Sequence, residues 1–234
     1  MMTPSLPAPG ARFQLTPRDR DAWIDWNWVR DSTDEIWDSL LSHLILTGLS
    51  LLIGMIIALP LAVLASRHRR FYPPLLGFTG ALYTIPSLAL FALLIPYTGL
   101  SRTSALIPLT SYTLLILVRN TVAGLDAVPP SVREAAEGMG YSPFASLLRV
   151  ELPLAVPTIV AGIRIATVTV IGLVTVTALI GQDNLGQLML DGLSRDFRSP
   201  LTVGIVLSLA LAVVADLVLA GVARLATPWR RDLR

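Results

Sequence analysis

The chain has 234 residues, of which 53% are hydrophobic and 15% are charged, and its mean hydropathy is +0.67. This balance excludes an ordinary soluble domain and predicts a polytopic membrane protein, while a net charge of +2 is too small to indicate nucleic-acid binding. The absence of cysteine excludes thiolate chemistry, and the absence of lysine excludes a conventional P-loop ATPase, whose lysine must reach the nucleotide phosphates.

The N-terminal tail, residues 1–40, has no apolar stretch of its own and therefore does not fit a cleavable signal peptide. It carries a group of tryptophans that suits a membrane interface, namely Trp23, Trp26, Trp28 and Trp37. We expect a short amphipathic helix here that lies on the bilayer. Trp229, after the last apolar segment, suits the opposite interface.

Five segments are long and apolar enough to cross a hydrocarbon core about 30 Å thick, which needs about 20 helical residues. They run from Leu44 to Ala65, Leu75 to Pro96, Ala105 to Leu125, Leu154 to Ile180 and Leu201 to Ala223. The predicted fold class is therefore an all-α polytopic membrane protein. Its transmembrane domain covers residues 41–228, and a short C-terminal tail covers residues 229–234.

Arginines cluster in three regions that flank the spans, and the positive-inside rule places these regions in the cytoplasm. These are Arg67, Arg69 and Arg70 after span one, Arg133 and Arg149 after span three, and Arg224, Arg230, Arg231 and Arg234 after span five. We expect the N-terminus outside and the C-terminus in the cytoplasm. Four arginines in the N-terminal tail oppose this orientation, but three regions outweigh one.

Polar residues in spans two and three are candidates for the transport pathway. Tyr83, Thr84 and Ser87 surround Pro86, which can loosen the second helix and form a gate. The plainer alternative is a packed, kinked helix whose hydroxyls bond its own backbone. Arg119 and Asn120 are placed at the end of span three, where we expect them to cap helix carbonyls or to line the inner vestibule.

The longest stretch between spans, residues 126–153, carries signals for two short helices set at an angle. In chain order these signals are Pro129–Pro130, a capping box at Ser131 and Glu134, Gly138 and Gly140, Ser142–Pro143, and Pro153, which ends or kinks the second helix. In the first helix Ala135, Ala136 and Met139 share one small apolar face. An ordinary amphipathic surface helix is the alternative at this point.

The spacing in this stretch resembles a known loop. Glu134-Ala135-Ala136, three residues, Gly140, nine residues and Val150-Glu151-Leu152-Pro153 is similar to the EAA loop of ABC importer permeases, EAA-x3-G-x9-I-x-LP, with Val150 in place of Ile. In that family the loop is a coupling helix that docks on an ATP-hydrolysing subunit. The resemblance implies a MetI-like, type I importer fold and a coupling role for Arg133, Glu134, Ala135, Ala136, Met139, Gly140, Leu152 and Pro153.

From Leu41 to Pro228 the chain resembles the osmoprotectant branch of these permeases, which imports glycine betaine, choline, carnitine and related quaternary amines. The matching stretches are Ser42–Thr47, Thr84–Leu90, Val118–Thr121, Gly162–Ala166 and Ala178–Gly181. Where the family usually has a glycine-rich turn of the form GxGGLG, this chain has GQDNLG. Asp183 and Asn184 replace two small, flexible residues, and this restricts left-handed backbone angles. Gln182, Asp183 and Asn184 become candidate pathway residues, with a simple solvated loop as the alternative.

Three charged residues lie inside predicted spans, Arg119 in the third, Arg164 in the fourth and Asp216 in the fifth. Ionised groups are costly within the bilayer, so we expect a structural Arg164–Asp216 pair, with independent snorkelling to the interface as the alternative. His43, at the outer edge of span one, is expected to be an interfacial polar residue. No metal site is expected.

The resemblance implies the permease subunit of an ATP-driven importer for compatible solutes, which is not itself an enzyme. No cofactor is expected on this chain, because ATP and Mg would bind the partner ATPase. The implied partners are two ATP-binding subunits, a second permease copy or paralogue, an extracytoplasmic solute-binding protein and membrane lipid. The alternatives are an importer of another amino-acid-like solute and an ion-coupled secondary transporter, which an odd span count disfavours.

Overall fold

A computed structural model describes residues 23–226, and every regular element in that range is helical. In chain order the elements are α2 (Trp26–Asp31), α3 (Thr33–Arg67), η1 (Arg69–Phe71), α4 (Tyr72–Thr84), α5 (Ser87–Thr98), α6 (Arg102–Asp126), α7 (Pro130–Gly138), α8 (Pro143–Ser146), the π-helical turn η2 (Leu147–Glu151), α9 (Leu152–Val176), η3 (Thr177–Ile180), α10 (Leu185–Ser194) and α11 (Arg198–Ala226). Trp229, the C-terminal tail and residues 1–22 of the N-terminal tail lie outside the described residues.

Four helical stretches are long and apolar enough to cross a membrane: α3, α6, the run Pro143–Ile180, and α11. A fifth span results if α4 and α5, which are bent by 91° at a short break, are counted as one. The described residues thus hold four spans, or the predicted five when the bent pair counts as one, and that second span is broken rather than continuous. The first helix starts earlier than predicted, and its 35 residues reach about 52 Å at about 1.5 Å per residue, well beyond a bilayer core.

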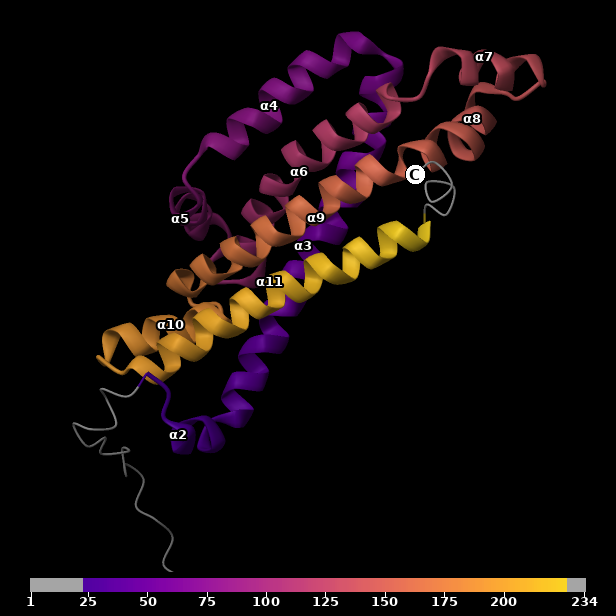
Figure 1. Cartoon of the computed structure of the whole chain (residues 1–234). Coiled ribbons are helices and arrows are strands. Elements are labelled where there is room, and N and C mark those ends of the chain that lie inside the picture. The colour runs from indigo at the N-terminus through magenta and orange to yellow at the C-terminus, as the bar shows by residue number, and fades with distance from the viewer. Residues whose placement is uncertain (1–22, 227–234) are drawn as a thin grey trace, which may run out of the picture.

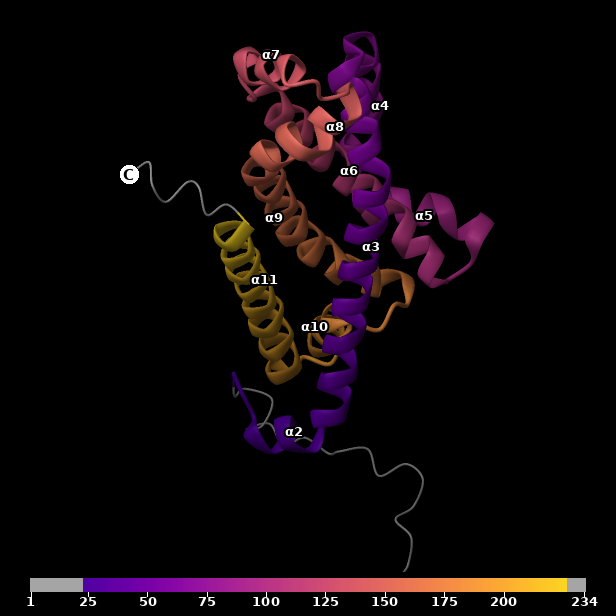
Figure 2. The ribbon, with the colours of Figure 1, turned by 90° about the vertical axis from the view of Figure 1, so that its right-hand side faces the viewer.

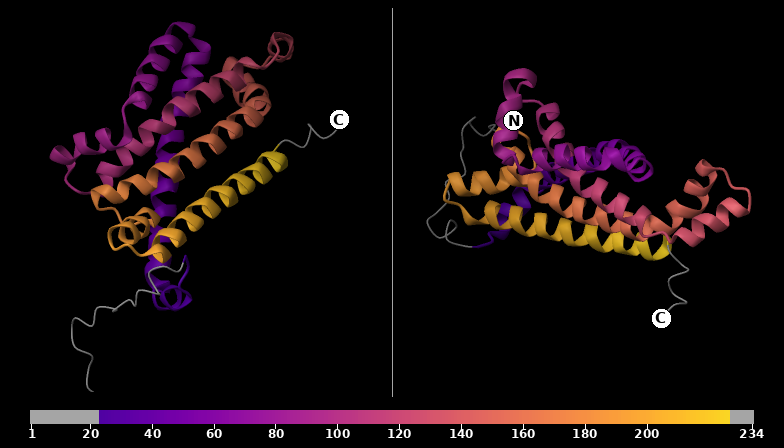
Figure 3. Two further views of the ribbon diagram at one scale, coloured as in Figure 1. Left: turned by 60° about the vertical axis from the view of Figure 1, so that its left-hand side comes forward. Right: turned by 90° about the horizontal axis from the view of Figure 1, so that it is seen from above.

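The helices α6, α9 and α11 run side by side, and α3 crosses them (Figure 1, Figure 3). α6 lies at the centre, packed between α3 and α9, while α4 and α5 pack against α6, and α11 packs against α9 and α10 (Figure 2). We call the end that carries α7 and α8 the loop end. The last turns of α3, α6 and α11 reach it, whereas α2 and α10 lie at the opposite end (Figure 1).

Small residues let the central helices approach closely, as expected where apolar lipid removes most of the hydrophobic gain from helix association. Ala58, Ala62 and Ala65 on α3 are fully buried in the main core. A Cβ on Gly54 would lie well inside 3.0 Å of the Thr113 hydroxyl on α6. The same holds for Gly162 of α9 against a side chain of α6, so both crossings depend on glycine.

Candidate functional site

The loop end carries α7 and α8 (Figure 1). The predicted capping box is wrong: α7 begins at Pro130 after Pro129, without a side-chain cap, so Ser131 already lies in the first turn and is not available as the N-cap. Of the later signals, Gly140 and Ser142 hold, whereas Gly138 lies inside α7 without a positive φ, so the prediction for Gly138 is wrong. Gly140 has φ +84°, a left-handed angle that favours glycine, and the Ser142 hydroxyl accepts from the Ala145 amide at 3.3 Å.

The apolar surface of the loop differs from the predicted face. Met139 and Phe144 are 70% and 69% exposed, and Ala135 is exposed beside them, whereas Ala136 is buried at 1% and faces the protein. The prediction that Ala136 joins the exposed face is therefore wrong, because the turn packs that side of α7 inward. The exposed apolar patch of the loop consists of Ala135, Met139 and Phe144. Glu134 is exposed next to it.

The end of the motif anchors the loop instead of extending its surface. Leu152 packs against a buried cluster of Leu125, Leu147, Ala155 and Ile159. Pro153, predicted to end or kink the second helix, lies in the first turn of α9, directly after a π-helical turn. The chain stays helical from Pro143 to Ile180, with a π-helical turn directly before Leu152, so the register changes there but the helix does not stop.

A group of charges connects several helices at the loop end. The buried Glu151 carboxylate, 3% exposed, pairs through Oε1 with Arg67 at the end of α3, and its Oε2 lies 3.1 Å from Nε of Arg133 on α7. Arg133 also donates through Nη2 to the Leu125 carbonyl of α6 at 2.6 Å. We call Glu151, Arg67 and Arg133 the Glu151 junction.

The polar residues of the second span surround the break between α4 and α5. Ile85 and Pro86 are extended, as a residue before proline tends to be. The freed Ile85 carbonyl accepts from the Tyr112 hydroxyl of α6, and the Tyr83 ring packs edge-on against Tyr112 at 5.6 Å between centroids. The Thr84 hydroxyl donates to its own helix, to Ala81 O at 2.8 Å.

This break is sharper than a loosened proline helix, and α6 supplies the partner that its backbone needs inside a membrane. Ser87 begins α5 directly after the break. The Thr84 hydroxyl bonds its own helix, as the plainer alternative expected, and the span is interrupted at Pro86. The gate stays a prediction.

Asn120 does not cap the end of the third span. Its Nδ2 donates to Ile116 O at 2.8 Å, and α6 continues to Asp126, so the predicted capping role is wrong. Its side chain instead fills the crossing with α9, where a Cβ on Gly162 would meet Asn120 Cγ at 2.9 Å. Asn120 lies six residues before the end of α6 at Asp126, inside the predicted span rather than at its end.

The Arg164–Asp216 pair forms as predicted, between α9 and α11. It is bidentate, with Arg164 Nε donating to Asp216 Oδ1 at 2.8 Å and Nη2 donating to Oδ2 at 2.7 Å. Two parallel charge-assisted bonds fix the relative register of the two helices. Since α11 is otherwise mostly exposed, this ion pair adds a polar contact to the apolar packing of α11 against α9.

At the end opposite the loop end, the turn GQDNLG (residues 181–186), which differs from the family pattern, has an unstrained backbone. Only Gly181 is left-handed, at φ +75°, and neither Asp183 nor Asn184 has a positive φ. Asn184 is completely buried: its Oδ1 accepts from Gly186 N at 2.7 Å and its Nδ2 donates to Thr177 Oγ1 at 3.0 Å. Asn184, one of the two residues that differ from the family pattern, thus serves as the N-cap of α10 and does not weaken the turn.

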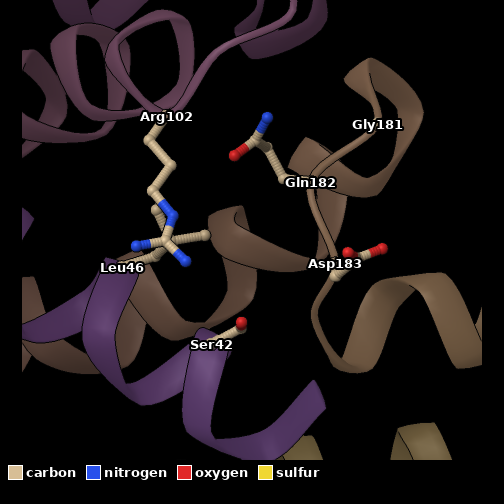
Figure 4. A pocket seen from close by; sticks show the side chains of 6 residues that line it. All are labelled: Ser42, Leu46, Arg102, Gly181, Gln182 and Asp183. Atoms are coloured by element: carbon tan, nitrogen blue, oxygen red, sulfur yellow. The ribbon is translucent and has the colours of Figure 1, made fainter. Parts of the chain in front are cut away.

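A small cavity of about 100 Å³ opens beside this turn (Figure 4). Its lining residues are Ser42, Leu46, Arg102, Gly181, Gln182 and Asp183. Figure 4 shows Arg102 extending from the start of α6 toward α3, across from the turn. Of the predicted pathway residues in the turn, Gln182 and Asp183 line this cavity, whereas Asn184 is buried as a structural cap.

His43 is not interfacial. It is fully buried, and its Nε2 lies 3.1 Å from the Ile171 carbonyl of α9. The expectation was wrong because α3 starts at Thr33, which moves His43 well inside the helix. Of the four tryptophans in the tail, Trp23, Trp26 and Trp37 are exposed at this end, whereas Trp28, on the six-residue α2, packs edge-on against Phe197 at 5.7 Å between centroids. Their place at a membrane interface stays a prediction.

Sequence reasoning missed four contributors: Arg67, Tyr112, Phe144 and Glu151. Glu151 falls in the variable position of the quoted motif, and Arg67 was used only for orientation. The one available signal was a carboxylate next to an apolar Leu-Pro start of a span, since such a group needs a partner. Tyr112 carried no signal, because its partner lies 27 residues earlier in the chain.

Comparison with known proteins gives a consistent result. The family model described as binding-protein-dependent transport system inner membrane component matches residues 36–227. The chain is 37% identical over 207 residues to the osmoprotectant import permease protein OsmW of Salmonella typhimurium, covering 86% of this chain and 96% of that protein. It is 34% identical over 186 residues to the glycine betaine/carnitine/choline transport system permease protein OpuCB of Bacillus subtilis, covering 80% and 86%.

Among solved structures, an inward-facing form of the MetNI methionine ABC transporter has a chain that matches with a TM-score of 0.76. The match covers 84% of this chain and 98% of that chain at 22% identity, so it concerns the fold. The predicted MetI-like architecture is confirmed.

Proposed function

This chain belongs to the binding-protein-dependent transport system inner membrane components, and from that premise we propose that it forms half of the pathway of an ATP-driven importer for compatible solutes. The proposed solutes are small quaternary amines such as glycine betaine, carnitine or choline. The observation that carries this choice is the likeness to the glycine betaine/carnitine/choline transport system permease protein OpuCB along 86% of that permease's length.

We propose that the exposed apolar patch of the loop, Ala135, Met139 and Phe144, docks on a separate ATP-hydrolysing subunit. Large apolar side chains that stand free at 70% and 69% exposure indicate a protein contact when they protrude together with charged neighbours. Glu134 supplies such a charge on the same helix. Gly140 and Ser142 hold the patch in place through the turn between α7 and α8.

The proposed complex contains two ATP-binding subunits, a second permease copy or paralogue and an extracytoplasmic solute-binding protein. ATP and Mg would bind the ATP-binding subunits. In the cell membrane, the loop end would face the cytoplasm with the C-terminus, and the N-terminus would lie outside. The turn with Gln182 and Asp183 would then face the binding protein, and the α4–α5 break with Tyr83, Thr84, Pro86 and Ser87 would border the pathway.

A tagged chain purified from its native membrane tests this proposal, because its partners should come with it. We expect an ATP-binding subunit in the preparation, and ATP-dependent accumulation of labelled glycine betaine or choline in vesicles supplied with the binding protein. Binding assays with carnitine and an unrelated amino acid rank the solutes. Uptake by the chain alone, driven by an ion gradient, would contradict the proposal and support a secondary transporter.

A further inference from the structure

The Glu151 junction joins four helices at the loop end. Both oxygens of one carboxylate are used, Oε1 by Arg67 of α3 and Oε2 by Arg133 of α7. Arg133 adds a bond of 2.6 Å to the Leu125 carbonyl in the last turn of α6. Glu151 itself ends the π-helical turn that leads into α9. The junction therefore connects the first turn of α7 to α3, α6 and α9 at once.

Because the Glu151 carboxylate is buried, it needs positively charged partners. The Glu151 side chain is 3% exposed, whereas Arg67 and Arg133 are 36% and 33% exposed. A buried carboxylate without a counter-charge is unfavourable, so Glu151 holds both arginines in place. The arginines would otherwise repel one another, since they meet at the same carboxylate. Glu151 is thus the centre of the junction.

The apolar contacts beneath the junction are less directional. Leu59 and Val63 of α3 pack against the cluster that includes Leu147 and Ile159. Apolar side chains permit small shifts of one helix over another, whereas the charge-assisted hydrogen bond from Arg67 to Glu151 fixes a specific geometry. Arg133 Nε approaches Glu151 as an ion pair and does not form a hydrogen bond with it. The π-helical turn beside Glu151 is a local change of register of the kind often found at functional positions.

We propose that Glu151 is a positioning residue that transmits movement of α7 to α3, a helix that the loop does not adjoin in sequence. This inference rests on the proposed function, because it takes α7 as the element that an ATP-binding subunit moves. Without the carboxylate, α7 and α3 would move independently. ATP would then be hydrolysed without a matching movement of the transport pathway.

The test compares Glu151→Gln with the control Asp126→Asn in the purified complex. Asp126 also forms an ion pair between elements at the loop end, with Arg69 at 2.7 Å, but that pair does not include α7. For Glu151→Gln we expect solute uptake per ATP hydrolysed to fall at least about fivefold, the lower range of typical coupling between sites. The control should keep the wild-type ratio.

A double substitution separates the junction from a general loss of stability. If Arg67 acts through Glu151, then Arg67→Gln combined with Glu151→Gln should be no worse than Glu151→Gln alone. Additive losses, or a wild-type uptake ratio in Glu151→Gln, would overturn the proposal. If Glu151→Gln does not assemble, Arg67→Gln alone provides the test, and it should lower the ratio in the same direction.

A distance measurement tests the junction without ATP or partners. The chain contains no cysteine, so Leu64→Cys on α3 and Glu137→Cys on α7, both exposed, accept spin labels uniquely. We expect one narrow distance distribution in the otherwise unchanged chain and a broad one with Glu151→Gln. An unchanged distribution would overturn the inference. A complex that lacks ATP-driven uptake but broadens in this way would instead contradict only the proposed function.

Discussion

Substitution of Gly54 by alanine tests how closely α3 and α6 must approach. A Cβ at this position would lie well inside 3.0 Å of Thr113 Oγ1, 3.1 Å from Thr113 Cβ and 3.5 Å from Leu117 Cδ1. The Thr113 hydroxyl is not free to rotate without loss, since it donates to Thr110 O at 2.7 Å. The two helices must therefore separate or this hydrogen bond must break.

Overpacking of a tight core costs about 1 to 3 kcal/mol. Alanine recovers about 0.5 to 1 kcal/mol, because glycine loses more backbone freedom in a helix. We expect Gly54→Ala to lower the free energy of unfolding by on the order of 1 kcal/mol or more. Gly48→Ala, on the same helix with nothing within 4 Å of its added Cβ, should be neutral or stabilising.

The assay is reversible unfolding of the purified chain in mixed micelles of mild detergent and SDS, followed by helical circular dichroism. Thr113→Ala removes the obstructing oxygen, so the combination with Gly54→Ala should recover most of the lost stability. Equal effects of the substitutions at Gly54 and Gly48 would refute the reasoning. So would a double variant that is less stable than Gly54→Ala alone.

Four further substitutions test three other contacts. Arg164→Asp and Asp216→Arg should each reduce the amount of assembled protein in the membrane, and the two together should restore it; failure to restore would contradict a pairwise role. Tyr112→Phe leaves the Ile85 carbonyl without its partner and should lower unfolding stability by about 1 to 3 kcal/mol, measured in the same micelles, whereas an unchanged stability would contradict the assigned bond. Gly140→Val forces a left-handed angle on a β-branched residue and should reduce uptake per ATP while leaving membrane insertion intact; unchanged uptake would contradict the role of the loop.

The sequence predicted the helical fold and the count of spans because both follow from apolar length, which a bilayer demands of any spanning segment. It also predicted the Arg164–Asp216 pair, since two lone opposite charges in apolar spans strongly favour one another. Turn chemistry was informative where a residue has one conformational reason to be present. Gly140 and Ser142 are examples.

The remaining features depend on contacts between distant segments. The 91° break at Pro86 could not be separated from a mild kink, because the partner of the freed carbonyl is on another helix. His43 was misplaced because hydropathy locates apolar segments, not the polar turns that extend a helix beyond them. Ala136 was assigned to the exposed face from helical spacing, and only packing shows that its side faces inward.

The central claim is that the loop end lies in the cytoplasm, where its exposed patch meets an ATP-hydrolysing subunit. Met139→Cys gives a single labelling site, because the natural chain has no cysteine and Met139 is 70% exposed. In intact cells that lack the ATP-hydrolysing subunit, a membrane-impermeant maleimide should leave this site unmodified, and it should react once the membrane is opened or inverted. Modification from outside intact cells would contradict the account.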